Sequence, residues 1–442
     1  LGPWRSSGRA PAYRALAAGM RLLVVEGRVP LSARLPAERE LASVLGVSRT
    51  TVAAAYEVLR AEGFLASRQG SGSWTSLPDG HPVPTAGVRA VPAEQGPEVI
   101  DLGAAAPAAP EPWLTLAVRR AAEDIGAYTA SHGHFEAGLP VLREALAERY
   151  SARGVPTMPD QILVTGGGSM AALDLTLRIL LGRGDRVAVE APSYANTLAV
   201  LARAGARLVP VPFADGTGGD GGNSAAPEGT ASGWDMGEWR RVLHDAGPRL
   251  LYVIPDFHNP TGLLIGEDQR RELVAQARAA GAVVIADEAM ADLSDGSSPS
   301  MPPPMSAFDP GGGTVVTVGS AGKTFWGGLR IGWLRAAPDL VRRLAAERAH
   351  VDLGTPVLDQ LVVHRLVTEY EEEAVAFQRE RMRAGRDALV AAVRRELPTW
   401  EFTVPRGGLT LWVRTGGLSG PRIAAAGERL GLRVASGPRF GV

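Results

Sequence analysis

Cysteine is absent from this sequence of 442 residues, and lysine is almost absent, because Lys323 is the only lysine among 46 basic residues. The lack of cysteine excludes disulfide bonds and thiolate metal sites. No apolar run reaches the roughly 18 residues of a membrane-spanning helix, and the stretch 21–29 is too short and too charged for a signal peptide. These absences are compatible with the cytosol, and we expect a cytoplasmic protein without a metal site or a membrane span. Where arginine is otherwise used throughout, a retained lysine is expected to serve as a primary amine.

Charge is unevenly distributed along the chain, although the net charge is only −1. Residues 1–75 carry ten arginines and five glutamates, whereas the remainder carries 36 basic and 42 acidic residues. A small basic part joined to a larger acidic part is typical of a protein whose basic part meets a polyanion. Chance clustering of surface arginines would give the same counts, so charge alone leaves both interpretations open.

The first 75 residues show helical periodicity followed by a hairpin pattern. Helices are predicted at residues 13–26, 35–45 and 49–62, and strands at 64–68 and 73–75. Pro36 suits the first turn of the second helix, Gly46 suits its end, and Ser48 is a good N-cap for the third helix. Two helices joined by a tight turn and followed by a hairpin predict a winged helix-turn-helix. In this α+β domain, the second helix of the pair enters the major groove of DNA.

Three segments of this part resemble the DNA-binding domain of GntR-type regulators. They are Arg34-Leu-Pro-Ala-Glu-Arg-Glu-Leu-Ala42, Leu45-Gly-Val-Ser-Arg-Thr-Thr-Val52 and Ala55-Tyr-Glu-Val-Leu-Arg-Ala-Glu-Gly63. By this resemblance, the residues that would contact operator DNA are Arg39, Ser48, Arg49, Thr50, Thr51 and Gly70. Arginine offers a fork to guanine or phosphate, and small hydroxyl side chains bond phosphates. The alternative is a winged helix that contacts protein instead of DNA.

Two segments of biased composition divide the chain. Residues 76–98 are rich in proline, glycine and alanine, which predicts a semi-rigid linker. Residues 214–233 consist mostly of glycine, aspartate, serine and alanine, which predicts a disordered surface loop inserted in a folded domain. The expected organisation is therefore a winged helix-turn-helix at 1–75, a linker at 76–98 and a larger domain at 99–442.

The larger domain alternates short apolar runs with helical segments. The apolar runs, which are typical of buried strands, are Ile162–Thr165, Arg186–Glu190, Leu250–Ile254, Ala282–Ala286 and Thr314–Val318. Helical segments such as 170–181 and 268–280 lie between several of them, which predicts a mostly parallel α/β sheet with helices on both faces. Ligands of such sheets bind beyond the carboxyl ends of the strands. The polar residues that stand out follow the strands there, at 166–169, 192–194, 259–262, 287 and 320–323.

These polar residues suit one kind of ligand. A glycine turn that leads into a helix cradles a phosphate with backbone N–H groups and the positive end of the helix. An aromatic side chain, a buried carboxylate, an amide and a lysine suit an aromatic aldehyde cofactor that forms a Schiff base with the lysine. Each signal is weak alone, and only their order and spacing make the set specific.

Residues 100–442 resemble the fold-type I aminotransferases, which bind pyridoxal phosphate. The resemblance runs through 139–143, 165–174, 184–194, 255–262, 286–289 and, most specifically, Gly319-Ser-Ala-Gly-Lys-Thr-Phe-Trp-Gly-Gly-Leu-Arg-Ile-Gly332. A GntR-type domain at residues 1–75, called the head below, joined to an α/β domain of this kind at residues 99–442, called the body, resembles the MocR-type regulators. The joint resemblance covers most of the chain.

The resemblance implies a role for each cofactor-binding residue. Lys323 would be the catalytic residue, because a Schiff base needs an unprotonated primary amine and arginine stays charged. Asp287 would pair with the pyridine nitrogen, Asn259 would donate to the phenolate oxygen, and Tyr194 would stack on the ring. The residues that would hold the phosphate are Gly168, Ser169, Ser320 and Arg330. The glycine run is one residue longer than the usual pattern, which leaves a one-residue shift of the turn open.

Three features depart from the family pattern. Met290 stands where an aromatic hydroxyl normally bonds the cofactor, and this loss is expected to weaken binding by roughly 1 kcal/mol. The segment 133–137 replaces a Tyr-Gly-Asp-Pro type motif. His134, Phe135 or Tyr128 would then fill the space. The arginine that usually binds a substrate carboxylate lies beyond the end of this sequence, so we expect either a C-terminal truncation or a different mode of binding.

Three functions are consistent with these patterns. The favoured one is a homodimeric transcriptional regulator whose head binds operator DNA and whose body senses an amine, an amino acid or pyridoxal phosphate itself through Lys323. The first alternative is an active aminotransferase that carries a DNA-binding head. The second is a regulator whose body is a dimerisation scaffold without cofactor, against which the set of Lys323, Asp287, Asn259 and Arg330 argues.

Overall fold

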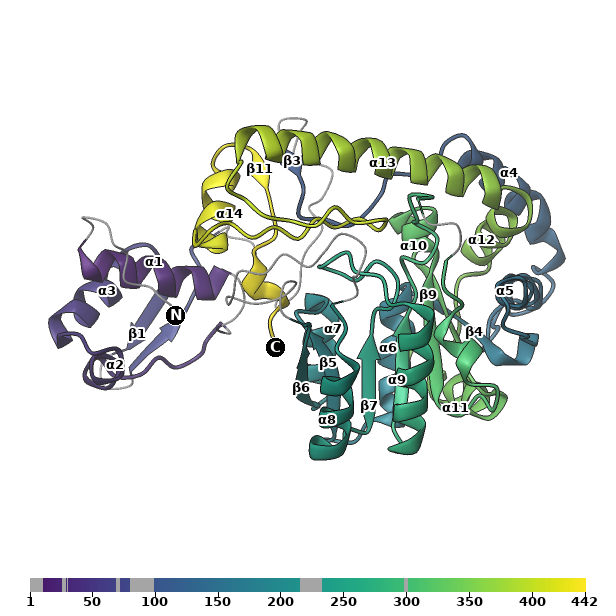
Figure 1. The fold of residues 1–442 in the computed structure, drawn as a ribbon, viewed down its shortest axis with the longest axis horizontal. Coiled ribbons are helices and arrows are strands. Elements are labelled where there is room, and N and C mark those ends of the chain that lie inside the picture. The colour runs from purple at the N-terminus through teal and green to yellow at the C-terminus, as the bar shows by residue number, and fades with distance from the viewer. Residues whose placement is uncertain are drawn as a thin grey trace. The chain divides into compact units, whose positions relative to one another are not determined.

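The computed structural model describes residues 11–25, 29, 31–68, 72–79, 99–214, 233–297 and 301–442. The chain divides into two compact units, one formed by residues 1–103 and 420–439 and the other by residues 104–419 and 440–442 (Figure 1). Most of the predicted linker, from residue 80 to 98, and most of the predicted loop, from 215 to 232, lie outside the described residues.

The N-terminal part of the first unit is a three-helix winged domain. Its elements are α1 (Ala12–Val25), α2 (Glu38–Leu45), α3 (Arg49–Ala61), β1 (Leu65–Arg68) and β2 (Gly72–Thr75). The two strands pair antiparallel, with Leu65 opposite Thr75. The predicted helices and hairpin are confirmed. One detail was wrong: α2 begins at Glu38 after the N-cap Ala37, so Pro36 precedes the helix instead of occupying its first turn.

Short-range signals fix the ends of these helices. Gly46 ends α2 with a φ of 60°, a left-handed conformation that glycine adopts without steric cost. The side chain of Ser48 accepts the backbone N–H of Thr51 at 3.1 Å and so caps α3. The hydroxyl of Tyr56 donates to the carbonyl oxygen of Pro36 at 2.8 Å, which ties α3 to the chain before α2.

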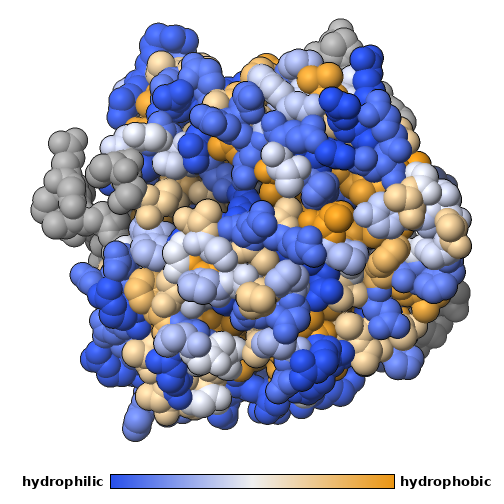
Figure 2. Space-filling view, turned by 90° about the vertical axis from the view of Figure 1, so that its right-hand side faces the viewer, coloured by the Kyte–Doolittle hydropathy of each residue, from blue (hydrophilic) through white to orange (hydrophobic). Residues whose placement is uncertain are grey.

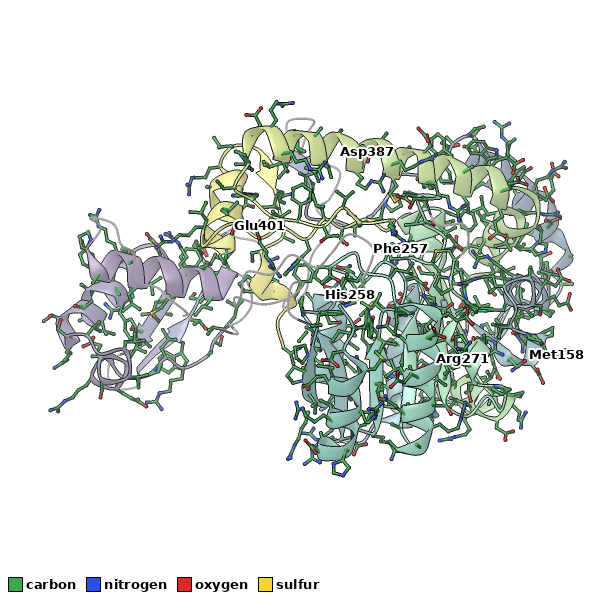
Figure 3. The ribbon with its side chains drawn as sticks, in the orientation of Figure 1. Met158, Phe257, His258, Arg271, Asp387 and Glu401 are labelled. Atoms are coloured by element: carbon green, nitrogen blue, oxygen red, sulfur yellow. The ribbon has the colours of Figure 1, made fainter. Side chains whose placement is uncertain are left out.

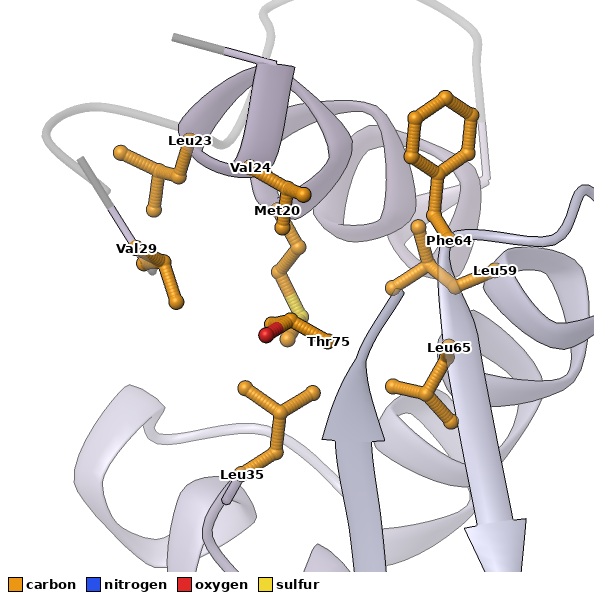
Figure 4. Close-up of a pocket in the computed structure, with 9 residues that line it drawn as sticks. All are labelled: Met20, Leu23, Val24, Val29, Leu35, Leu59, Phe64, Leu65 and Thr75. Atoms are coloured by element: carbon orange, nitrogen blue, oxygen red, sulfur yellow. The ribbon is translucent and has the colours of Figure 1, made fainter. Parts of the chain in front are cut away.

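The three helices bury one apolar core, which includes Leu16, Val52, Tyr56 and Leu59. Within it lies a small cavity of about 30 Å³ (Figure 4). The residues that line it are Met20, Leu23, Val24, Val29, Leu35, Leu59, Phe64, Leu65 and Thr75. Leu77 packs against the same core, so the winged domain uses residues just beyond its last strand.

The first unit also contains a small element from the far end of the chain. Strand β3 (Ile100–Asp101) pairs in parallel with β11 (Leu432–Arg433), and α14 (Gly420–Glu428) precedes β11. Residues near the C-terminus therefore share a unit with residues near position 100.

The second unit is built on a seven-stranded sheet with the order β4-β10-β9-β8-β7-β5-β6. The strands are β4 (Ile162–Gly166), β5 (Arg186–Ala191), β6 (Arg207–Pro212), β7 (Leu250–Val253), β8 (Val283–Asp287), β9 (Val315–Ser320) and β10 (Ile331–Arg335). Only β10 runs antiparallel to its neighbours, so the predicted mostly parallel sheet is confirmed. Strands β6 and β10 were not predicted.

Helices cover both faces of this sheet, as predicted. One face packs against α6 (Ser169–Leu180), α7 (Ala195–Arg203) and α11 (Pro338–Arg348), and the other against α8 (Met236–Ala246) and α9 (Glu267–Ala279). The remaining helices of the unit are α4 (Trp113–Asp124), α5 (Pro140–Ala152), α10 (Ala321–Thr324), α12 (Val357–Glu369) and α13 (Glu371–Glu396). No helix of the described residues is long and apolar enough to cross a membrane.

The residues on either side of the undescribed segment 215–232 are tied together. The backbone N–H of Ala214 donates to the carbonyl oxygen of Gly233 at 2.7 Å. The ring of Phe213 packs edge-on against the ring of Trp234, with centroids 5.6 Å apart, and against that of His258 at 4.9 Å. Residues 213–214 and 233–234 are therefore held together by a backbone hydrogen bond and an aromatic contact.

Candidate functional site

The predicted cofactor-binding residues follow five strands of the body sheet. Asp287 is the last residue of β8, and Lys323 lies in α10 directly after β9. Gly168 precedes α6 after β4, Tyr194 precedes α7 after β5, and Asn259 follows β7. Since these five strands run in the same direction, the structure brings the residues together at the carboxyl ends of the strands. This end of the sheet is called the cofactor edge below. Figure 3 shows Phe257 and His258, the neighbours of Asn259, at this edge.

Lys323 lies half-buried at this edge. Its Nζ donates to the backbone carbonyl oxygen of Ala105. Burial lowers the pKa of the Lys323 ammonium, and the charge of Arg330 lowers it further, while Asp287 acts in the opposite direction. Burial and Arg330 therefore shift the equilibrium of Lys323 toward the amine, which is the form that attacks an aldehyde.

A phosphate-sized group of donors lies beside the lysine. A Cβ placed on Gly168 would be 3.4 Å from the Oγ of Ser320 and 3.7 Å from an Nη atom of Arg330. Ser169 is the first residue of α6, so backbone N–H groups of a helix start point toward the same space. Hydroxyl, guanidinium and helix N-terminus together form a donor set that fits a phosphate dianion.

Arg330 connects the two loops of this donor set through its backbone and its side chain. Its φ is 52°, a left-handed conformation that costs a non-glycine residue roughly 1–3 kcal/mol. In this conformation its carbonyl oxygen accepts the N–H of Gly168 at 2.9 Å and also that of Gly167, whose own carbonyl oxygen accepts from the guanidinium. A Cβ on Gly332 would overlap the backbone of Gly168, so this close approach requires glycine.

Asp287 is held through both carboxylate oxygens. The hydroxyl of Tyr252 donates to Oδ2 at 2.8 Å, and the backbone N–H of Ala289 donates to Oδ1 at 3.1 Å. Burial raises the pKa of Asp287, while these two donors and the charge of Lys323 lower it. A buried carboxylate with partners of this kind fits a protonated ring nitrogen.

Tyr194 lies half-buried near Asp287 and Arg330, and burial raises the pKa of its hydroxyl. Asn196 donates to that hydroxyl at 2.9 Å. Met290, which stands in the place of an aromatic hydroxyl, is buried against Phe257 and Leu293 and supplies only apolar contact. Tyr128 and Phe135 pack edge to face with each other, with centroids 5.9 Å apart, while His134 is exposed.

Sequence reasoning missed a buried pair behind this site. The Nε2 of His258 lies 3.4 Å from a carboxylate oxygen of Glu190, and both side chains are fully buried. His258 also contacts the hydroxyl of Thr261 at 2.8 Å, and Glu190 accepts the N–H of Ile254 at 2.9 Å. These contacts join the end of β5 to the loop that carries Asn259. The signal in the sequence was a glutamate at the end of an apolar run.

The predicted DNA-binding residues lie in α2 and at the start of α3. Arg39, Ser48, Arg49 and Thr50 are exposed and Thr51 is half-buried, while Gly70 lies outside the described residues. The hydroxyl of Ser48 lies 2.8 Å from those of both Thr50 and Thr51. Arg49 forms one weak ion pair with Glu38, at 3.2 Å, and its side chain remains 70% exposed. The start of α3 therefore presents hydroxyl groups and a guanidinium to solvent, as a recognition helix does.

No group of three or more histidine, aspartate and glutamate side chains that could hold a metal ion occurs among the residues that the structure describes.

Comparisons with known proteins agree with both parts of the chain. The sequence profile of the family "Aminotransferase class I and II" matches residues 97–430, and that of the "Bacterial regulatory proteins, gntR family" matches residues 12–74. The chain is 29% identical to the uncharacterized HTH-type transcriptional regulator YisV of Bacillus subtilis, over 93% of this chain and 86% of that protein. It is 30% identical to the probable rhizopine catabolism regulatory protein MocR of Rhizobium meliloti, over 88% of this chain and 78% of that protein.

The solved structures add an aminotransferase. The chain superposes with a TM-score of 0.67 and 28% identity on LysN, the alpha-aminoadipate aminotransferase of Thermus thermophilus. The superposition covers 78% of this chain and 84% of LysN, which was solved in complex with N-(5'-phosphopyridoxyl)-L-leucine.

Proposed function

The chain belongs to the aminotransferase class I and II family and carries a GntR-family DNA-binding domain, as MocR-type regulators do, and we propose that it senses an amine, an amino acid or pyridoxal phosphate. The observation that carries the proposal is the convergence of Lys323, Asp287 and Arg330 at one edge of the body sheet, in a chain whose head exposes the start of α3. A regulator of this kind works on the chromosome, so we place it in the cytoplasm.

Pyridoxal phosphate supplies an aldehyde that condenses with primary amines and a pyridine ring that accepts electrons. Lys323 would provide the amine, and burial lowers the pKa of its ammonium group. Gly168, Ser169, Ser320 and Arg330 would bind the phosphate, since the hydroxyl, the guanidinium and the start of α6 surround one space. Asp287 would hold a proton on the ring nitrogen, Asn259 would donate to the phenolate oxygen, and Tyr194 would cover the ring.

An effector amine would compete with Lys323 for the aldehyde that the cofactor supplies. A free Lys323 would have a hydrogen-bond acceptor, because its Nζ donates to the carbonyl oxygen of Ala105 in this structure. Release of the lysine changes its charge and its contacts, and such a local change can bias the conformation of a domain. Sensing therefore requires the lysine itself and not merely a filled pocket.

We propose that the protein acts as a homodimer, so that two heads read two half-sites. Helices α4 and α12 bring apolar side chains to the surface of the body, where Leu116, Val118 and Leu358 are 37%, 43% and 39% exposed. Figure 2 views this side and shows apolar side chains between polar ones. Sedimentation equilibrium measures the oligomeric state, and a monomer at micromolar concentration would contradict the proposed homodimer.

The cofactor part of the proposal is tested by titrating the purified protein with pyridoxal phosphate. The wild type should develop a visible absorbance band distinct from that of the free aldehyde, and Lys323→Ala should not. A gel-shift assay on operator DNA should then respond to an amine effector in the wild type only. A wild type that stays colourless at saturating cofactor would refute the cofactor site.

The DNA part is tested by footprinting with two variants of equal charge. Arg49→Ala should abolish the specific footprint, because it removes the exposed guanidinium at the start of α3. Arg14→Ala removes one positive charge from α1 and should leave the footprint intact. Equal footprints for Arg49→Ala and the wild type would reject the docking of α3 in the groove.

The second candidate function is an active aminotransferase, which the structural similarity to LysN favours. Turnover separates the two functions. An aminotransferase passes the amino group to a keto acid over many cycles, whereas a sensor exchanges its lysine for an amine and stops. Multiple turnovers measured by product formation would favour the enzyme.

A further inference from the structure

Two side chains in the first turn of α7 reach the two tyrosines of the cofactor edge. Asn196 donates from Nδ2 to the hydroxyl of Tyr194 at 2.9 Å. Its neighbour Thr197 donates from Oγ1 to the hydroxyl of Tyr252 at 3.0 Å. One helical turn therefore fixes a tyrosine of the loop after β5 and a tyrosine inside β7.

The contact to Tyr252 continues to the carboxylate. A tyrosine hydroxyl carries one proton, and Tyr252 gives it to Oδ2 of Asp287 at 2.8 Å. Thr197 therefore acts as donor to Tyr252, and the hydrogen bonds run in one direction from Thr197 to Asp287. Thr197 and Tyr252 are fully buried and Asp287 is 7% exposed, so water does not compete for these bonds.

The direction of this relay matters because each donor stabilises the charged form of the group that accepts from it. Burial and the charge of Glu190 favour the neutral carboxylic acid, and the hydrogen bond from Tyr252 opposes them. The other charged or titratable groups near Asp287 are Lys323 of α10, Glu190 of β5 and Tyr194. The side chain that donates a hydrogen bond to the carboxylate is that of Tyr252.

We propose that Tyr252, supported by Thr197, is a positioning residue that keeps Asp287 ionised and oriented toward the ring nitrogen of the cofactor. Asn196 orients Tyr194 from the same helical turn, so α7 aligns the group that covers the ring with the group that pairs with its nitrogen. This inference rests on the proposed binding of pyridoxal phosphate at Lys323.

The test compares two variants that each remove one buried tyrosine hydroxyl. Tyr252→Phe removes the donor to Asp287. Tyr150→Phe is the matched control, because Tyr150 is 2% exposed and its hydroxyl accepts only a structural hydrogen bond, from the indole of Trp333 at 3.2 Å. The affinity for pyridoxal phosphate is measured by fluorescence titration between pH 5 and pH 8, and the unfolding temperature is measured without cofactor.

Tyr252→Phe should weaken the binding of pyridoxal phosphate by about tenfold at neutral pH. It should also move the pH below which binding is lost upward, because Asp287 then takes up a proton more readily. Thr197→Val should have the same two effects to a smaller degree. Tyr150→Phe should lower the unfolding temperature and leave the affinity and its pH dependence unchanged.

The outcomes separate this inference from the proposed function. A wild type that does not bind pyridoxal phosphate would overturn the proposed function. A wild type that binds, with an unchanged affinity and pH profile in Tyr252→Phe, would overturn the role of Tyr252 alone. Equal losses of affinity in Tyr252→Phe and Tyr150→Phe would show a purely structural effect and would also overturn it.

Discussion

Two aspartates of the second unit, five residues apart, have opposite electrostatic surroundings. Asp287 accepts hydrogen bonds from neutral donors, and burial raises its pKa. Asp292 is half-buried, pairs with the guanidinium of Arg149 at 2.5 Å and accepts from Thr324 at 2.5 Å, and these partners hold its pKa at about 2. Asp292 therefore stabilises the fold in its charged form, whereas a charged Asp287 weakens it.

The substitution Asp287→Asn should stabilise the protein without cofactor and weaken its binding of pyridoxal phosphate. A raised pKa means that ionisation is less favourable in the folded state than in the unfolded state. At neutral pH the charge therefore costs about 1.4 kcal/mol for each pKa unit of the shift. Urea denaturation of the cofactor-free protein measures the stability, and a large loss of stability would contradict this account.

Asp292→Asn should have the opposite effect and lower the free energy of unfolding by about 2 kcal/mol at neutral pH. The pKa of Asp292 is depressed in the folded state, so its contribution is present above the pKa of an unfolded aspartate, about 3.9. It is lost as the pH falls toward about 2. The difference in stability between wild type and variant should therefore shrink below pH 4, and a constant difference down to pH 2 would count against the ion pair.

Single residues of the site could be predicted to very different degrees. Lys323, Asp287 and Asn259 stand in local motifs that carry their own chemistry, so the sequence identified them as candidates. Tyr252 lies within an apolar strand, so the sequence pattern indicates only a core residue. Its partner Asp287 is 35 positions away in the sequence. Contacts of this range exist only once the strands pair, so no local pattern could indicate the relay.

Helix α3 shows how one side chain can serve an element and a function at the same time. Ser48 caps the helix and also lies at the predicted DNA surface. Ser48→Ala should lower the stability of the head by about 1 kcal/mol, whereas Ser48→Gly should cost only a few tenths. Both variants should weaken operator binding if the hydroxyl bonds a phosphate. Thermal unfolding and gel-shift titration distinguish the two roles, and normal binding by Ser48→Gly would leave Ser48 with the cap alone.

The elements that the sequence did not predict have identifiable reasons. Strand β6 contains two prolines and lies at the edge of the sheet, where missing N–H groups are tolerated, so its composition argued against a strand. Strand β10 begins at Ile331, within the lysine motif, and runs antiparallel between β4 and β9. A regular alternation of strand and helix does not predict such a strand, because it enters the sheet without a crossover helix.

At the scale of the whole molecule, the basic charge of residues 1–75 should determine the salt dependence of DNA binding. Arg39→Ala in the full chain should reduce the slope of log affinity against log salt by about 1 if its guanidinium neutralises one phosphate. Arg271→Ala is the control, because Arg271 lies in α9 of the body and pairs with Glu267 at 2.7 Å (Figure 3). A slope that changes equally in both variants would mean that the net charge of the chain, and not the head, sets the dependence.

Residues on both sides of the segment 215–232 contact each other, so the stability of the body should not depend on the length of that segment. Ala214 and Gly233 already meet through a backbone hydrogen bond, and Phe213 and Trp234 anchor both sides. The cost of closing a loop between fixed ends changes only slowly with its length. Exchange of residues 215–232 for Asn-Gly should therefore leave the unfolding temperature and the affinity for pyridoxal phosphate within error of the wild type. The same position would then accept a fluorescent reporter domain close to the cofactor edge, and loss of folding in the shortened chain would show that the segment itself is needed.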